Sequence, residues 1–294
     1  MTLEACHDAL GMKLPRFTYH RPESLEEALA LLAEHDDVKV LAGGQSLIPL
    51  MALRLGAPGH LVDIARLPEL ADVRDDDGAL AVGAGVTYAR AERSEQVEAA
   101  APLLARALPQ IGHQAIRSRG TVCGSLAHAD PAAELPAVAV ASGASVVVRS
   151  VRGERVVPAA EFFQGYLSTA LEPDELIVEV RFPAFPETAG AAVVELSRRH
   201  GDFALVGVAA TVDVADGTIA ACSLVFFGAG SVPCRVEDAE AALVGAPPVA
   251  GRVDEAAAIV SAQLDPPDDI HGSRAYRKHV AGVLTRRALT EATT

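Results

Sequence analysis

The order of the strand-like and helical segments changes near residue 188. Before that point, short apolar runs and helical runs alternate irregularly. After it, all the strand-like runs come first (191–198, 204–214 and 218–227) and all the helical runs follow (236–244, 252–263 and 273–290). Strands segregated from helices are typical of an α+β domain. The intervening FPAFPET, with Pro183 and Pro186, favours a linker, so we expect a domain boundary there.

The first part of the chain contains one clear amphipathic helix. Ser24 and Glu27 have the spacing of a capping box, and Leu25, Leu29 and Leu32 recur at helical intervals. The other segments are predicted as strands (38–44, 61–65, 79–85 and 176–183), a hairpin (144–157) and a second helical region (87–108).

Charge and cysteine spacing exclude several classes of function. A formal net charge of −14 disfavours nucleic-acid binding, because that affinity comes mainly from Lys and Arg on phosphates. The cysteines contain no C-x-x-C pair, which disfavours a zinc or iron–sulfur site and predicts reduced thiols; they are Cys6, Cys123, Cys222 and Cys234. No apolar run reaches the roughly 18 to 20 residues of a membrane span, and the N-terminus lacks signal-peptide features. We expect a cytoplasmic protein.

The segment VLAGGQSLIPLM (40–51) places Gly43 and Gly44 at the end of a strand-like run. Glycine can adopt positive φ and turn successive N–H groups toward one point, which makes an anion-binding nest. An ordinary tight turn has the same pattern, and the Walker Lys and the G-x-G-x-x-G fingerprint are both absent. Alone, this segment favours the tight turn.

A second segment, RSRGTVCGSLAHADPAAELP (117–136), changes that balance. It supplies another flexible loop with hydroxyl and N–H donors, and Asp130 and Glu134 follow closely. Hydroxyls and N–H groups can hold diphosphate oxygens, while a carboxylate can accept from ribose hydroxyls. Two neutral donor loops in an acidic chain are what a buried dinucleotide cofactor requires.

Together, A-G-G-x-S at 42–46 and R-x-R-G-T-V-x-G-S-L-A-H-A-D-P-A-A-E at 117–134 resemble the FAD-binding medium subunit of molybdenum hydroxylases. That family includes carbon monoxide and nicotine dehydrogenases and the flavin domain of xanthine dehydrogenase. The resemblance implies a two-part FAD-binding domain of the PCMH or vanillyl-alcohol-oxidase type over 14–187, divided near 60–70. It also implies a small α/β C-terminal domain over 188–292, with a three-stranded antiparallel sheet and helices.

The resemblance also implies a set of cofactor contacts. Those on the FAD diphosphate are Ala42, Gly43, Gly44, Gln45, Ser46, Thr121, Gly124 and Ser125. The others are Ile111 beside the cofactor, Glu134 near its ribose or adenine half, Leu171 against the adenine and Phe203 by the isoalloxazine ring. The sequence departs from the family at Gln45, Cys123 and Phe203, where some members have His, Gly and Tyr or Trp.

Cys123 has a redox role as its alternative to a small buried side chain, and an acid–base role for the flavin is the alternative for three histidines, His113, His128 and His200. A structural role is favoured for each of the four. Arg198 is favoured as a partner of reduced flavin or of a phosphate, with a solvated position after a strand as the alternative.

By resemblance, this chain is an electron-transfer subunit without catalytic residues or metal of its own. FAD would take electrons from [2Fe-2S] clusters on a small partner subunit and pass them to an external acceptor, while a large molybdopterin subunit oxidises the substrate. Two alternatives stay open: a stand-alone FAD-dependent oxidoreductase acting directly on a small organic molecule, and a scaffold subunit that has lost FAD.

Overall fold

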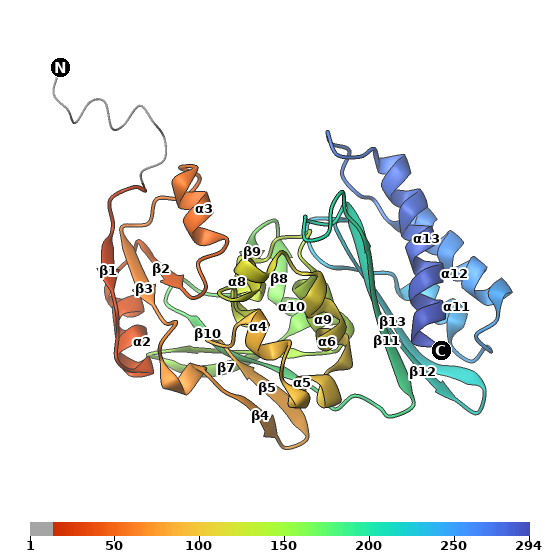
Figure 1. Cartoon of the computed structure of the whole chain (residues 1–294), viewed down its shortest axis with the longest axis horizontal. Coiled ribbons are helices and arrows are strands. Elements are labelled where there is room, and N and C mark those ends of the chain that lie inside the picture. Colours follow the sequence, from red (N-terminus) through yellow and green to blue (C-terminus); the bar gives the residue numbers. More distant parts are fainter. Residues whose placement is uncertain (1–13) are drawn as a thin grey trace.

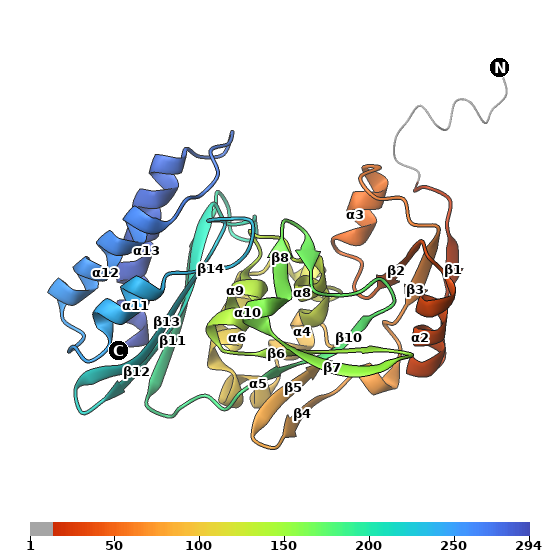
Figure 2. The same ribbon diagram turned by 180° about the vertical axis from the view of Figure 1, so that it is seen from behind.

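The computed structural model describes residues 14–294, which form three units side by side along the long axis of the molecule (Figure 1). The N-terminal unit lies at one end, a central sheet with its helices lies in the middle, and the C-terminal sheet and helices lie at the other end. Figure 2 shows the same order from behind. Cys6 lies outside the described residues.

The N-terminal unit is a parallel sheet covered by one helix. Its strands β1 (Thr18–His20), β3 (His60–Asp63) and β2 (Val38–Leu41) pair in that order. Helix α2 (Leu25–Glu34) begins where predicted, with the Ser24 hydroxyl accepting from the Glu27 N–H. The Glu27 carboxylate accepts in return from the Glu23 N–H at 2.7 Å, one residue before the usual capping-box partner. The short helix α3 (Leu47–Ala52) follows the first glycine segment.

The central unit is built on a five-stranded antiparallel sheet of order β4-β5-β10-β6-β7. The strands are β4 (Val73–Asp76), β5 (Ala79–Gly83), β10 (Leu176–Phe182), β6 (Ser145–Ser150) and β7 (Gly153–Pro158). The predicted hairpin is β6 and β7. Strand β4 escaped prediction because its sequence, VRDD, is charged, as suits an exposed edge strand. A minor ribbon pairs β8 (Phe163–Gly165) with β9 (Ser168–Thr169), after the single-turn helix α10 (Ala159–Phe162).

The helical region expected over 87–108 is divided into α4 (Tyr88–Ala91), α5 (Glu95–Ala100) and α6 (Pro102–Ala107), followed by the turn η3 (Leu108–Gln110). Ser94 caps α5, and Pro102 begins α6 after Ala101 leaves helical geometry. The prediction of a flexible loop over 117–136 is wrong. Most of it is helical, because α7 (Gln114–Arg117), α8 (Val122–His128) and α9 (Glu134–Ala141) occupy the segment.

The C-terminal unit contains four antiparallel strands rather than the three predicted. Strands β11 (Ala189–Leu196), β12 (Val206–Ala215) and β13 (Thr218–Phe227) match the predicted runs, and β14 (Cys234–Arg235) adds a fourth. Two residues are too short to show strand alternation in a sequence, and β14 forms because it pairs with Val225 and Phe226. Helices α11 (Glu237–Leu243), α12 (Ala250–Gln263) and α13 (Arg274–Ala292) cover one face of this sheet.

Burial links the central and C-terminal units. One apolar core runs from Leu25 of α2 to Phe227 of β13, and a second fills the space between the C-terminal sheet and its helices. Helix α9 contacts both β12 and β13, so its first residue, Glu134, belongs to the helices of the central unit that pack against the C-terminal sheet. Within residues 14–294, no helix combines the length and the apolar character needed to cross a membrane.

Candidate cofactor-binding site

The two glycine-bearing segments contact each other through their backbones. A Cβ added at Gly43 would lie 2.1 Å from the Arg119 carbonyl oxygen and 2.7 Å from the Gly120 Cα. A Cβ added at Gly124 would be 3.9 Å from the Ala42 Cβ. Only glycine at position 43 permits this approach, so the tertiary fold brings together what the sequence separates.

The first segment presents a run of unpaired N–H groups. Gly44 adopts a φ of +70°, and its carbonyl accepts from the Ile48 N–H at 3.1 Å. Within residues 14–294, the N–H groups of residues 43–47 donate no hydrogen bond, and the Ser46 side chain does not cap α3. N–H groups turned outward at a positive-φ glycine form a concavity that suits an anion.

Gln45 stabilises the turn from within. Its side-chain amide donates to the Gly43 carbonyl at 3.0 Å, so that oxygen is satisfied while the neighbouring N–H groups stay free. The sequence leaves the role of Gln45 open, and the structure shows that its side chain holds the turn at Gly43.

The second segment contributes a capped helix rather than a flexible loop. Thr121 is buried at the N-cap of α8, and its Oγ1 accepts from the Gly124 N–H at 3.0 Å. A Cβ at Gly124 would lie 2.7 Å from that same oxygen. Gly124 is therefore required by the cap, its φ is not positive, and its N–H is already paired.

Two side chains of α8, Cys123 and Ser125, pack inside the protein to different depths. Cys123 is buried, and burial raises the pKa of its thiol well above the ordinary value, so the thiol stays protonated and unreactive. Ser125 is half-buried beside Tyr88, whose pKa burial raises to about 12.

Two acidic side chains with raised pKa values lie near each other. Glu134, 5 % exposed, begins α9, and burial raises its pKa to about 8, with a further contribution from the charge of Glu195. Glu195 lies in β11, and burial raises its pKa to about 7. The Glu195 Oε2 is buried and has no hydrogen-bond partner among the described residues. Sequence reasoning missed Glu195, although a lone acidic residue in the apolar strand AAVVEL was a usable signal.

Ile111 is buried at the end of η3, in a segment fixed by Arg117. One Arg117 guanidinium nitrogen donates to the carbonyls of Ile111 at 3.2 Å and Gly112 at 3.1 Å. A Cβ at Gly201 would lie 2.8 Å from both the Gly112 carbonyl oxygen and the His113 ring. The Ile111 segment therefore touches the loop that carries Phe203.

Phe203 is 61 % exposed and lines a cavity of about 520 Å³ between the central and C-terminal units. Tyr166, Arg198 and Arg277 also line it. The second glycine segment reaches the cavity through residues 130–132, whereas none of the lining residues within 14–294 belongs to 42–46 or 119–125. Leu171 is half-buried after β9 and packs against the first core. The structure thus brings residues 42–46 against residues 119–125, and Phe203 shares its cavity with residues 130–132 of the second segment.

The candidate histidines differ in environment. His113 and His200 are exposed, while His128 is half-buried. Burial lowers the pKa of His128, against the opposing effect of Asp130 at 4.0 Å. These positions identify no acid–base pair.

The features of the glycine segments and of Glu195 fit FAD. The 43–47 N–H groups suit a diphosphate, and the orphaned Glu195 oxygen suits a ligand hydroxyl.

Comparison with known proteins gives the family. Residues 15–185 match the FAD binding domain in molybdopterin dehydrogenase, and residues 191–292 match the CO dehydrogenase flavoprotein C-terminal domain. The 6-hydroxypseudooxynicotine dehydrogenase complex subunit alpha of Paenarthrobacter nicotinovorans is 41 % identical over 96 % of each chain. The carbon monoxide dehydrogenase medium chain of Hydrogenophaga pseudoflava is 37 % identical, over 95 % of this chain and 97 % of that one.

Solved structures of the same family have the same fold as this chain. Carbon monoxide dehydrogenase from Hydrogenophaga pseudoflava, in a form lacking the Mo-pyranopterin moiety, matches with a TM-score of 0.93 and 39 % identity, over 96 % of this chain and 98 % of that one. Quinoline 2-oxidoreductase from Pseudomonas putida 86 matches with a TM-score of 0.92 and 38 % identity, with the same coverage. The predicted fold class, an FAD-binding part followed by a smaller C-terminal domain, is confirmed. The chain belongs to the FAD-binding medium subunits of the carbon monoxide dehydrogenase and xanthine dehydrogenase family, which are oxidoreductase subunits of molybdenum hydroxylases.

Proposed function

We propose that this chain carries electrons from the [2Fe-2S] clusters of a small partner subunit, through bound FAD, to an external acceptor. A large molybdopterin subunit would oxidise the substrate. The observation that carries the proposal is the contact between the two glycine segments, with unpaired N–H groups at residues 43–47. The relatives support the assembly, since they are named as medium chains or subunits of dehydrogenases.

The proposed cofactor site lies within an FAD-binding domain over 14–187, followed by a C-terminal domain over 188–292. The 43–47 N–H groups and the hydroxyls of Ser46 and Ser125 would hold the diphosphate, because a chain of net charge −14 has little positive charge to offer. Thr121 and Gly124 would act by holding α8 in place, since the Gly124 N–H is already paired with Thr121. FAD supplies the redox chemistry when bound, and the protein supplies position and electrostatics.

The other proposed contacts are distributed over several elements. Glu134, with a pKa raised to about 8, is mostly protonated at neutral pH and can both donate to and accept from ribose hydroxyls. The unpartnered oxygen of Glu195 adds an acceptor that the family resemblance did not suggest. Ile111 would contact the cofactor, Leu171 its adenine and Phe203 its isoalloxazine ring. Free thiols at Cys123, Cys222 and Cys234 support a reducing, cytoplasmic location.

The proposal is tested by Gly43→Val, because any side chain at that position meets the backbone at Arg119. We expect the variant to lose at least nine-tenths of its flavin while circular dichroism shows a folded chain. Gly56→Val is the matched control, since a Cβ at Gly56 meets nothing within 4 Å. Full flavin content in Gly43→Val would contradict the assignment of this segment.

The function itself is tested on the complex purified from cells through this chain. We expect FAD, iron and molybdenum, and we expect substrate to reduce the flavin only when the partner subunits are present. Reduction of the flavin by substrate in the isolated chain would favour a stand-alone oxidoreductase. A colourless chain that cannot be reconstituted with FAD would favour a scaffold subunit.

A further inference from the structure

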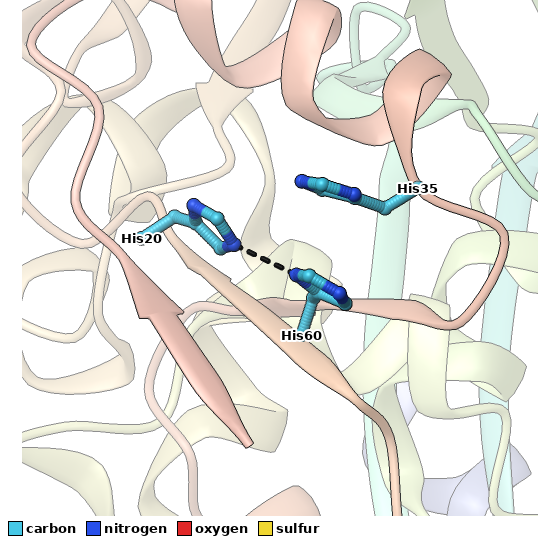
Figure 3. Close-up of side chains that lie close together, drawn as sticks. All are labelled: His20, His35 and His60. Atoms are coloured by element: carbon cyan, nitrogen blue, oxygen red, sulfur yellow. Dashed lines mark hydrogen bonds between the residues drawn. The ribbon is translucent and has the colours of Figure 1, made fainter.

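Three histidines gather at the edge of the N-terminal unit. His20 ends β1, His60 begins β3, and His35 follows the last residue of α2. The Nε2 of His20 and the Nδ1 of His60 are 2.9 Å apart, and the His35 and His60 rings stack with centroids 3.8 Å apart. Figure 3 shows His35 over His60, with His20 beside them.

The parallel register explains why the rings meet. Thr18 pairs with His60 and His20 with Val62, so His20 and His60 lie two positions apart on neighbouring strands. His60 and Val62 share a face of β3 because alternate residues point the same way. Val62 is buried in the first core with Leu25 and Leu29 of α2. That face is therefore the one that α2 covers, and His35 at the end of α2 completes the group.

The group is separate from the proposed cofactor site. Val38 pairs with His60, and Leu41 pairs with Asp63, so β2 and β3 run side by side from the histidines toward the glycine segment. His60 stands at the beginning of these strands, and Gly43 follows their end. The turn before His60 is held by Asp37, whose carboxylate accepts from the Gly59 N–H at 2.8 Å and whose carbonyl accepts from the His60 N–H at 3.0 Å.

The chemistry of the three rings suits a transition-metal ion. Each ring offers one nitrogen, and these three atoms lie within 4.8 Å of one another. Two imidazole nitrogens on a tetrahedral Zn²⁺ are about 3.3 Å apart, since Zn–N bonds are about 2.0 to 2.1 Å. The His20–His60 pair is already close to that spacing, and rotation of the His35 ring would close the set. All three side chains are half-buried, which leaves a route for the ion and room for water as a fourth ligand.

We propose that His20, His35 and His60 bind one divalent ion of the zinc, cobalt or nickel type. Imidazole suits these ions better than magnesium or calcium, which prefer oxygen ligands. The bound ion would fasten β1 and β3 to the end of α2. Its role is structural, because the site lies at the other end of the strands from the glycine segment.

The test uses the full chain with its cofactor content unchanged, without a polyhistidine tag and stripped of metal by a chelator. We expect Co²⁺ to bind at one equivalent per chain and to give the visible absorption of a tetrahedral site. Zn²⁺ should displace it and should raise the melting temperature, since an ion that binds only the folded state stabilises that state.

His35→Gln should weaken Co²⁺ binding at least tenfold, because it removes one ligand and leaves a side chain of similar size. His279→Gln, on the exposed side of α13, is the matched control and should bind as the wild type does. The wild-type measurement needs no variant to fold: failure to take up Co²⁺ or Zn²⁺ would overturn the proposal and would assign the rings to stacking alone. Equal binding by a variant with all three histidines replaced by Gln would also overturn it. Flavin content reports on the proposed function independently of either result.

Discussion

Gly43, Gly124 and Gln45 show how differently neighbouring motif residues can act. Gly43 is needed because another backbone occupies the space of a side chain. Gly124 is needed because a Cβ would displace the Thr121 hydroxyl that caps α8. Gln45 satisfies the Gly43 carbonyl. The sequence identifies all three positions but explains the glycines by one property, a flexible loop with positive φ. Neither Gly43 nor Gly124 has a positive φ, whereas Gly44 does.

Glu134 should make stability depend on pH. Its pKa of about 8 in the folded chain lies above the ordinary 4.5, so the folded state holds a proton that the unfolded state has released. Stability is therefore lost as pH rises from about 4.5 through 8, at no more than about 1.4 kcal/mol per pH unit. We expect Glu134→Gln to flatten this fall, as measured by urea unfolding at pH 5, 6, 7 and 8. The exposed Glu98→Gln is the control, and identical slopes for Glu134→Gln and wild type would contradict the prediction.

Among the elements, those with strong local signals were predicted and those created by pairing were not. Helix α2 has a capping box and an apolar stripe, and it begins at Leu25 as expected. Helix α8 was predicted as a loop because GTVCGSLAH contains two glycines, which usually disfavour a helix. It forms because Thr121 caps it and because Val122, Cys123 and Leu126 are buried against the central unit. Strand β14 exists only through its pairing with β13.

The Thr121 cap of α8 should affect both stability and flavin binding. Thr121→Ala should lower the free energy of unfolding by about 1 kcal/mol, because the Gly124 N–H loses its partner. It should also weaken flavin retention, since α8 follows the Arg119–Gly120 backbone that contacts Gly43. Ser94→Ala removes a comparable cap from α5 and should cost similar stability without changing flavin content. Equal flavin loss in both variants would show that flavin retention follows overall stability and not the position of α8.

Across the whole molecule, the C-terminal helices are fitted to their sheet as closely as the glycine segments are fitted to each other. A Cβ at Gly190 in β11 would lie 1.9 Å from the Ala292 carbonyl oxygen of α13. The other face of this sheet contributes Ala191, Val193 and Phe227 to the core shared with the central unit. The C-terminal sheet therefore joins two cores, so a change on its helical side can be separated from the proposed cofactor site.

Gly190→Ala should lower the free energy of unfolding by about 1 to 3 kcal/mol, because the end of α13 must move to admit the methyl group. Chemical denaturation measures the loss, and hydrogen exchange should locate faster opening in α13 while flavin content is unchanged. Gly251→Ala in α12 is the control, since a Cβ there meets nothing within 4 Å and alanine favours a helix. Unchanged exchange in α13 would show that the helix end accommodates the methyl group freely.

The sequence by itself determined the α+β organisation, the strand and helix order beyond residue 188, and the family, because apolar periodicity and two long motifs are local properties of a chain. Only the tertiary structure decided that residues 42–46 lie against residues 119–125, that Glu134 has Glu195 as a neighbour, and that His20, His35 and His60 meet. These contacts join residues from separate elements. They depend on strand register and on how closely backbones approach, and a single sequence contains no local signal for either.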